Sequence, residues 1–442
     1  MIKIYRRELG IGPFALLVSL VAFLAFGLVG CDDPLDVENP NSLVEEDLDD
    51  PIAANALANG SLNNVAIGVA SVLTPTLTAT DEIVWIGSRD AWRELDFGNV
   101  AFAGNEFSDQ AMKNMHRGRW MADKAVATLE KFDSDIVNWG ERIELARGYL
   151  YAGMVRIYIA DWFDDWVFSH KTEAATNVGA SNMNSVYADA ISYLDKALSI
   201  AQSESDTDLQ TRILALRARA KHASAIWTLL SGGTTPASPW VNAGTADAEA
   251  ALALMADDNY KWQFLYAPGT ETNDLSENVN GRKELQITGD PNGNLPVNYI
   301  GLNDPITGTA DPRVLAIIAD FRDTDTYNGT AFAPIAIASA REMNLIIAEG
   351  LLASGNSAGA IEKMNAIRAL DALTPITVES ADEMLKHERR ANLHLTGRRL
   401  NDLYRYGERD PMWQSTSDAF NNVGTLLPIT DAELQTNPTI ND

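Results

Sequence analysis

Four segments of the chain repeat apolar side chains at steps of three and four residues, which places those side chains along one face of an α-helix. These segments are 141–160, 186–201, 209–231 and 358–370. In the last one the stripe consists of Ile361, Met364, Ile367 and Leu370. Such stripes are buried when amphipathic helices pack against one another, so we expect a fold dominated by α-helices.

The helices are expected to pair as hairpins, and 339–370 gives the clearest case. Residues 340–353 predict one helix, Ser354-Gly355-Asn356 predicts a tight stop, and a second helix is expected from Ser357. Glycine suits the stop because helices often end in a left-handed residue, which glycine adopts without strain. This arrangement resembles a tetratricopeptide unit. An ordinary helical domain with hairpins is the alternative.

A different composition covers 232–335, which is rich in Gly, Pro, Asn, Asp and Thr and is interrupted by one expected helix near 245–256. Long loops in a compact domain are usually either functional or disordered. The aromatic residues of the segment, including Trp240 and Trp262, argue against disorder. We therefore expect a loop-rich ligand-binding subdomain lying over the helical scaffold.

The first 31 residues predict export and lipidation. Lys3, Arg6 and Arg7 precede an uncharged, mostly apolar run that ends at Cys31, the only cysteine of the protein. A transmembrane anchor is the alternative, but Leu28-Val29-Gly30-Cys31 resembles a lipobox, in which the thiol carries the lipid. We thus predict a lipoprotein signal peptide over 1–30, an acidic tether over 31–50 and a single helical domain over 51–442.

The net charge of −27 argues against nucleic-acid binding, because so acidic a surface repels phosphate. The five histidines show no zinc-ligand spacing, and no nucleophile elbow or phosphate-binding loop is present. The acidic clusters at 47–50 and 320–325 indicate a solvated surface. We expect no catalytic residue, no metal and no cofactor, although a two-carboxylate glycoside hydrolase stays open because acids are plentiful.

One short stretch predicts a ligand site. Residues 80–94 combine two tryptophans with charged side chains in a non-periodic pattern, and the ligand-binding residues expected there are Asp81, Trp85, Arg89, Asp90 and Trp92. An indole ring stacks on the apolar face of a sugar or peptide, while charged groups bind its polar atoms. The alternative is that both tryptophans fill the core and the charges face water.

The C-terminal third carries a pattern of charges with glycines and leucines: Glu388-Arg389-Arg390, Leu393, Gly397, Arg399, Asp402-Leu403, Arg405 and Gly407. Mixed charges at helical spacing predict ion pairs between neighbouring helices, so we interpret the block as a structural clamp. The block also resembles the closing motif of the SusD/RagB family of outer-membrane nutrient-binding lipoproteins. Asn392 and Thr396 stand where that family usually has acids.

The resemblance implies a tetratricopeptide-like helical fold with a loop-rich ligand face. It implies a protein that does not catalyse, that is anchored to the outer membrane through a lipid on Cys31 and that is exposed at the cell surface. It also implies two partners, namely an oligosaccharide or peptide ligand and a SusC-like TonB-dependent transporter barrel. A tetratricopeptide-type scaffold that binds only other proteins remains the alternative.

Overall fold

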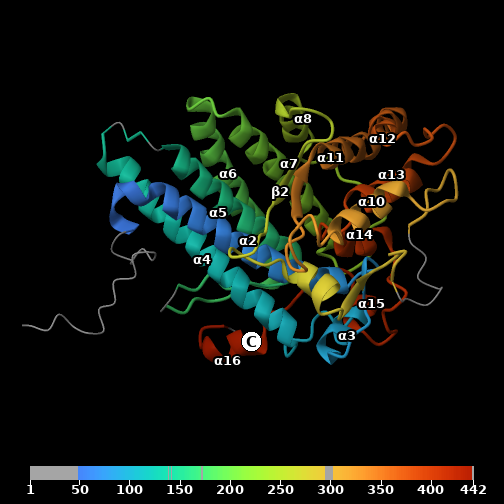
Figure 1. Ribbon diagram of the computed structural model, residues 1–442, viewed down its shortest axis with the longest axis horizontal. Coiled ribbons are helices and arrows are strands. Elements are labelled where there is room, and N and C mark those ends of the chain that lie inside the picture. Colours follow the sequence, from blue (N-terminus) through green and yellow to red (C-terminus); the bar gives the residue numbers. More distant parts are fainter. Residues whose placement is uncertain (1–47, 138, 141, 171–172, 294–301, 441–442) are drawn as a thin grey trace, which may run out of the picture. The chain divides into compact units, whose positions relative to one another are not determined.

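The computed structural model describes residues 48–137, 139, 140, 142–170, 173–293 and 302–440, and the part from Asp50 to Asp442 forms one compact unit. The fold is dominated by α-helices, as predicted (Figure 1). The predicted signal peptide, the lipidation site at Cys31 and the tether up to residue 47 lie outside the described residues. The signal peptide, the lipidation site and the tether therefore stay predictions.

Long helices that follow one another in sequence also pack against one another. These are α2 (Ala54–Thr78), α4 (Glu106–Asp135), α5 (Arg142–Trp162), α6 (Asn184–Ser203) and α7 (Thr207–Leu230), and Figure 1 shows α2, α4, α5 and α6 side by side. Glycines bring the first two close together. A Cβ atom on Gly118 of α4 would lie 2.8 Å from the carbonyl oxygen of Asn64 on α2, which is too near for any larger residue.

The segment Pro51–Thr78 is long and apolar enough to cross a membrane by length and composition. However, 67% of its most hydropathic window is buried inside the protein. Core helices of water-exposed proteins pass the same length test, because a helix that is apolar all round is covered either by lipid or by protein. The burial favours the second explanation for α2.

The predicted hairpins are confirmed. Helix α11 spans Ala340–Ala353, α12 spans Ser357–Leu370, and Gly355 between them has φ +80°. The expected stripe of α12 is also observed, since Met364 and Ile367 are buried against α11 and α13 (Ala381–Asn392). The pair α6 and α7 forms the second predicted hairpin.

The segment 232–335 contains more regular structure than its composition predicts. The expected helix is α8 (Thr245–Leu254), and the segment also holds β2 (Lys261–Phe264), α9 (Asp274–Ser276), β3 (Leu285–Ile287), α10 (Pro312–Phe321) and the start of β4 (Ile335–Ser339). Helix α10 had a local signal, because Asp311 accepts the backbone N–H of Arg313 and Pro312 occupies the first helical position.

Two small antiparallel sheets join parts of the chain that are far apart in sequence. Strand β1 (Ile83–Trp85) pairs with β3 so that Val84 lies opposite Gln286, and β2 pairs with β4. The register of the second sheet shifts between Trp262 and Gln263. The first pairing attaches the segment 232–335 to the chain between α2 and α3, and the second places β2 next to the strand that leads into α11.

The remaining helices are short, and all except α3 belong to the C-terminal part of the chain. They are α3 (Asp90–Asp96), α14 (Arg399–Tyr406), α15 (Asp418–Asn421) and α16 (Asp431–Thr436), with single turns at Pro51–Ala53, Ala180–Asn182 and Glu277–Gly281. Figure 1 shows α3 next to α15. The backbone N–H of Ala419 donates to the carbonyl of Gly98 at 2.9 Å, which fixes this contact.

Buried ion pairs connect the helices of the C-terminal half. Glu349 on α11 is fully buried and accepts hydrogen bonds from Arg405 at 2.5 Å and from His222 at 2.9 Å. Glu388 on α13, also fully buried, accepts from Arg368 at 2.8 Å and from Arg313 at 2.5 Å. The ion pairs predicted for the block 388–405 are thus confirmed.

The buried network makes a stability prediction. Changing Glu388 to Ala removes the buried carboxylate that Arg313 and Arg368 share. Each arginine then keeps a single acidic partner, Asp311 or Asp304, and loses one buried ion pair, so we expect the free energy of unfolding to fall by about 3–5 kcal/mol. Changing Glu383, whose exposed carboxylate pairs with Lys386 on the same helix, to Ala should cost under about 1 kcal/mol. Urea denaturation followed by far-UV circular dichroism measures both. An equal decrease in the free energy of unfolding of the two variants would contradict the role of the block 388–405 as a structural clamp.

Candidate functional site

The five residues predicted to bind ligand fall into an exposed and a buried group. Asp81 precedes β1 and Trp85 is its last residue, while Arg89, Asp90 and Trp92 lie at the end of the following turn and the start of α3. Arg89 and Asp90 are exposed and Trp85 is half-buried, whereas Trp92 is buried and the side chain of Asp81 is 11% exposed. Their role in ligand binding stays a prediction, and the geometry gives the two groups different physical settings.

Asp81 connects the start of this stretch to the C-terminal charge block. Its carboxylate accepts from Arg399 at 2.8 and 2.9 Å and pairs with Arg390 at 2.9 Å. Burial alone would raise the pKa of Asp81, but the two guanidinium groups outweigh burial and lower that pKa to about 2. Asp81 therefore stays ionised and holds the stretch in place.

Trp92 fills the interface between α3 and α4. Its side chain is 1% exposed and stacks on Phe107 with ring centroids 3.5 Å apart and an interplanar angle of 7°. In this arrangement the indole presents no open face to a ligand.

Exposed and partly exposed side chains of this stretch form a patch together with Phe107 of α4. We call this patch the loop surface; its residues are Trp85, Ile86, Arg89, Asp90, Arg93 and Phe107. The guanidinium of Arg93 lies 5.7 Å from the ring of Trp85, and that of Arg89 lies 5.6 Å from the ring of Phe107. Asp90 pairs with Arg93 at 3.0 Å while remaining largely exposed. The loop surface thus combines aromatic rings with hydrogen-bonding groups of both charges.

Glu284 fixes the turn that carries the loop surface. Its carboxylate accepts the backbone N–H groups of Ser88 at 2.7 Å and Arg89 at 3.1 Å, together with the hydroxyl of Ser88 at 3.1 Å. Slight burial raises the pKa of Glu284, but these donors outweigh it and lower that pKa. A Cβ atom on Gly87 would lie 1.9 Å from the carboxylate, so only glycine fits here. Sequence reasoning missed Glu284, because the contact spans almost 200 positions.

Two buried carboxyl groups lie behind the loop surface. Burial and, to a smaller extent, the negative charge of Asp410 raise the pKa of Asp96 to about 8. Burial likewise raises the pKa of Asp410 to about 7. Asp96 accepts the backbone N–H of Trp85 at 3.3 Å. A protonated Asp96 therefore supports the strand from which the loop surface begins.

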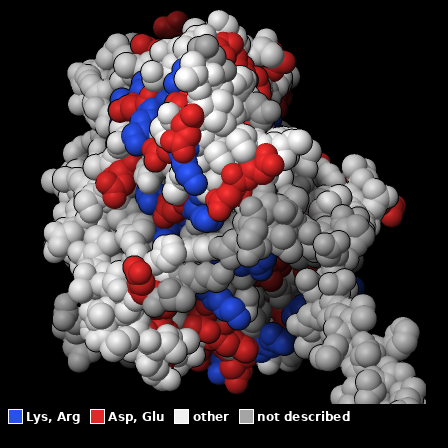
Figure 2. Space-filling view, turned by 90° about the vertical axis from the view of Figure 1, so that its left-hand side faces the viewer, with Lys and Arg blue, Asp and Glu red and all other residues white. Residues whose placement is uncertain are grey.

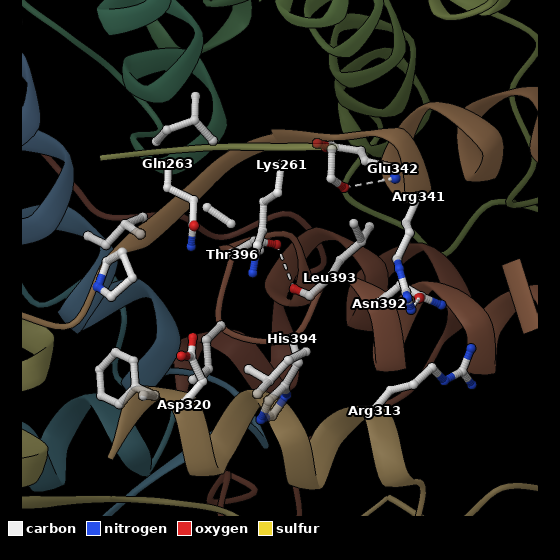
Figure 3. A pocket seen from close by; sticks show the side chains of 18 of the residues that line it. Lys261, Gln263, Arg313, Asp320, Arg341, Glu342, Asn392, Leu393, His394 and Thr396 are labelled. Atoms are coloured by element: carbon white, nitrogen blue, oxygen red, sulfur yellow. Dashed lines mark hydrogen bonds between the residues drawn. The ribbon is translucent and has the colours of Figure 1, made fainter. Parts of the chain in front are cut away.

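A cavity of about 480 Å³ opens on another part of the molecule (Figure 3). Its walls are β2 and β4, helix α10 and the segment 391–398, which comprises the end of α13 and the connection to α14. Lys261 and Gln263 extend from β2 toward the cavity, and Asp320 extends from α10 on the facing side (Figure 3). A volume of this size suits a small molecule. The sequence predicted no site here.

No protein-family model matches the sequence, and no curated protein is significantly similar to it. Solved structures are similar in fold. A SusD-like carbohydrate binding protein from Bacteroides vulgatus matches with a TM-score of 0.59 and 15% identity over 88% of this chain and 97% of its own. A SusD homolog from Bacteroides thetaiotaomicron matches with a TM-score of 0.57 and 13% identity over 90% and 98%.

The chain has a SusD-like fold. A third match, a SusD superfamily protein from Bacteroides vulgatus, has a TM-score of 0.58 and 13% identity over 89% of this chain and 98% of its own. The fold is therefore the one that the resemblance of the motifs at 388–407 implied. At these identities the likeness concerns the path of the backbone. The ligand of the SusD-like fold in this chain has to be argued from its own residues.

Charge is mixed on the surface of this SusD-like chain. Figure 2 shows one face, on which acidic and basic side chains lie next to one another. Within the described ranges, no group of three or more His, Cys, Asp or Glu residues is placed to hold a metal ion. Asp320 and Asp323, of the acidic cluster at 320–325, instead accept hydrogen bonds from Tyr327 and Thr326.

Replacing Trp92 should destabilise the protein more than replacing Trp85. Trp92→Ala removes a buried stacked ring, so we expect the free energy of unfolding to fall by about 3–5 kcal/mol. Trp85→Ala removes a half-exposed ring and should cost clearly less. Urea unfolding monitored by circular dichroism gives both values. A larger loss for Trp85 than for Trp92 would refute this assignment of core and surface.

The raised pKa of Asp96 predicts a pH dependence. The folded protein keeps this carboxyl neutral up to about pH 8, whereas the unfolded chain ionises it near 3.8. Stability should therefore fall as pH rises between these values, by up to roughly 1.4 kcal/mol per pH unit. Asp96→Asn cannot ionise, so its stability relative to the parent should increase from pH 5 to pH 8. The exposed Asp189→Asn should show no such trend, and a flat difference for Asp96→Asn would contradict the shift.

Proposed function

We propose that this protein is a non-catalytic binding protein that captures a glycan or another oligomeric nutrient at the bacterial cell surface. The observation that carries the proposal is the SusD-like fold, since a structure that it matches over 88% of the chain is described as a SusD-like carbohydrate binding protein. The nutrient then passes to a TonB-dependent outer-membrane transporter barrel, with which this protein would associate.

The loop surface supports ligand capture. A pyranose ring has an apolar face that stacks on an aromatic side chain, and its hydroxyl groups hydrogen-bond to charged side chains at the rim. Trp85 and Phe107 supply rings, while Arg89 and Asp90 supply donors and acceptors. Because Glu284 already fixes the turn through three hydrogen bonds, ligand binding need not order it, which favours affinity.

Anchoring rests on the sequence pattern around Cys31. A lipid on the first residue of the mature chain would hold the protein at the outer membrane, with the acidic tether as spacer. Mass spectrometry of the N-terminal peptide from membranes tests this step by itself. A Cys31→Ser variant should lose the acyl mass and leave the membrane fraction, whereas an unmodified Cys31 in the parent would refute anchoring.

The ligand proposal predicts a specific loss of affinity. Trp85→Ala and Arg89→Ala should each weaken binding of the oligosaccharide that the parent binds best by roughly threefold to tenfold, because each removes one stacking or hydrogen-bonding partner. Isothermal titration with gluco-, xylo-, manno- and chito-hexaose, and with penta-alanine for the peptide alternative, identifies that ligand first.

Trp227→Ala is the matched control, because Trp227 is a half-buried tryptophan on α7. Its affinity should equal that of the parent. If the parent binds a ligand and the two loop variants bind it with the same affinity, the ligand site lies outside the loop surface. If the parent binds no probe and co-purifies with other proteins, the tetratricopeptide-type scaffold becomes the better description.

A further inference from the structure

The cavity bounded by β2, β4, α10 and the segment 391–398 has a distinctive charge arrangement. Most charged side chains that line it are already paired with a partner of opposite sign. Arg341 binds Asp371 at 2.5 and 3.1 Å, and Arg398 binds Glu342 at 3.1 Å. Such pairs are satisfied within the protein and leave little capacity for a ligand.

Two lining charges differ from the rest. Within the described parts of the chain, neither the ammonium of Lys261 nor the carboxylate of Asp320 belongs to an ion pair, and both residues are exposed. One oxygen of Asp320 accepts the hydroxyl of Tyr327 at 2.7 Å, which orients the carboxylate and leaves its other oxygen free. Lys261 lies on a β2 position opposite Ser339, so its backbone is fixed by the sheet.

The two charges extend from facing walls. Figure 3 shows Lys261 on the strand side and Asp320 on the helix side, with Gln263 next to Lys261. Apolar side chains line the space as well, among them Ile317, Pro334 and Leu393. A ligand that satisfies this cavity needs an anionic group for Lys261 and a cationic group for Asp320, joined by an apolar body.

We propose that this cavity binds a small zwitterion, an ω-amino acid-like molecule whose carboxylate pairs with Lys261 and whose ammonium pairs with Asp320. This site is distinct from the loop surface and does not depend on the function proposed for it. Gln263 adds an amide donor beside the carboxylate. The apolar walls contact the methylene chain, so a neutral, hydroxyl-rich sugar should bind more weakly.

Isothermal titration of the full chain tests the proposal with zwitterions of increasing length: β-alanine, 4-aminobutanoate, 6-aminohexanoate and 8-aminooctanoate. One length should bind best, since only one spans the two charges. Hexanoate, hexylamine and 1,6-hexanediol are the comparison compounds, and each should bind at least about tenfold more weakly than the best zwitterion, because each lacks one or both charge-assisted hydrogen bonds.

Variants locate the site. Lys261→Met should reduce the affinity for the best zwitterion about tenfold while leaving the affinity for hexylamine unchanged. Asp320→Asn should likewise reduce the affinity for the best zwitterion about tenfold while leaving the affinity for hexanoate unchanged. Lys131→Met and Asp189→Asn remove an exposed lysine and an exposed aspartate on other helices and should bind like the parent. Ala316→Trp, at an exposed position of α10 that lines the cavity, should block binding without unfolding the protein.

Each result decides the proposal. A length optimum that disappears in Lys261→Met, Asp320→Asn and Ala316→Trp, all with parental melting temperatures, supports it. Absence of binding by every zwitterion overturns it, as does equal binding of zwitterion and hexylamine. Zwitterion binding that survives Ala316→Trp also overturns it, because the ligand would then occupy another site.

Discussion

The buried ion pairs around Glu349 and Glu388 are the interaction on which the rest of this structure depends. Both carboxylates are fully buried, and the arginines that bind them come from α10, α12, α13 and α14. Hydrophobic contacts alone would allow short helices to slide or rotate relative to one another. A bidentate contact between guanidinium and carboxylate strongly restricts how the two helices can be oriented, and removal of either partner breaks buried ion pairs at a cost in stability.

This network also determines where the loop surface lies. Arg399, on the same short helix α14 as Arg405, binds Asp81 two residues before β1, and His394 binds Glu82 at 3.1 Å. The stretch that carries the loop surface is therefore attached at its start to the C-terminal charge block, more than 300 positions away. Glu284 then fixes the turn after β1 from the other side. Rigid attachment at both ends gives the exposed rings a defined position before any ligand arrives.

The sequence predicted the helical fold well where the signal was local. The boundaries of α11 and α12 follow from apolar spacing and from a glycine that must adopt a positive φ, and both are properties of neighbouring residues. It predicted 232–335 poorly, because β2 and β4 are only four or five residues long and each is stabilised by its pairing with the other. Strands this short gain their stability from partners distant in sequence, which periodicity does not reveal.

The same distinction explains the candidate sites. Composition identified 80–94 as unusual, but it could not separate Trp85 at the surface from Trp92 in the core, because burial depends on Phe107 of α4. Nor could it reveal the cavity, where the two charges that form no ion pair among the described residues stand on β2 and α10, almost 60 positions apart. The sequence does not show whether a lysine has an ionic partner. Lys261 becomes distinctive only in the folded cavity, where most neighbouring charged side chains form ion pairs with one another. Pairing of the surrounding charges in three dimensions, rather than residue type, therefore marks the charges available to a ligand.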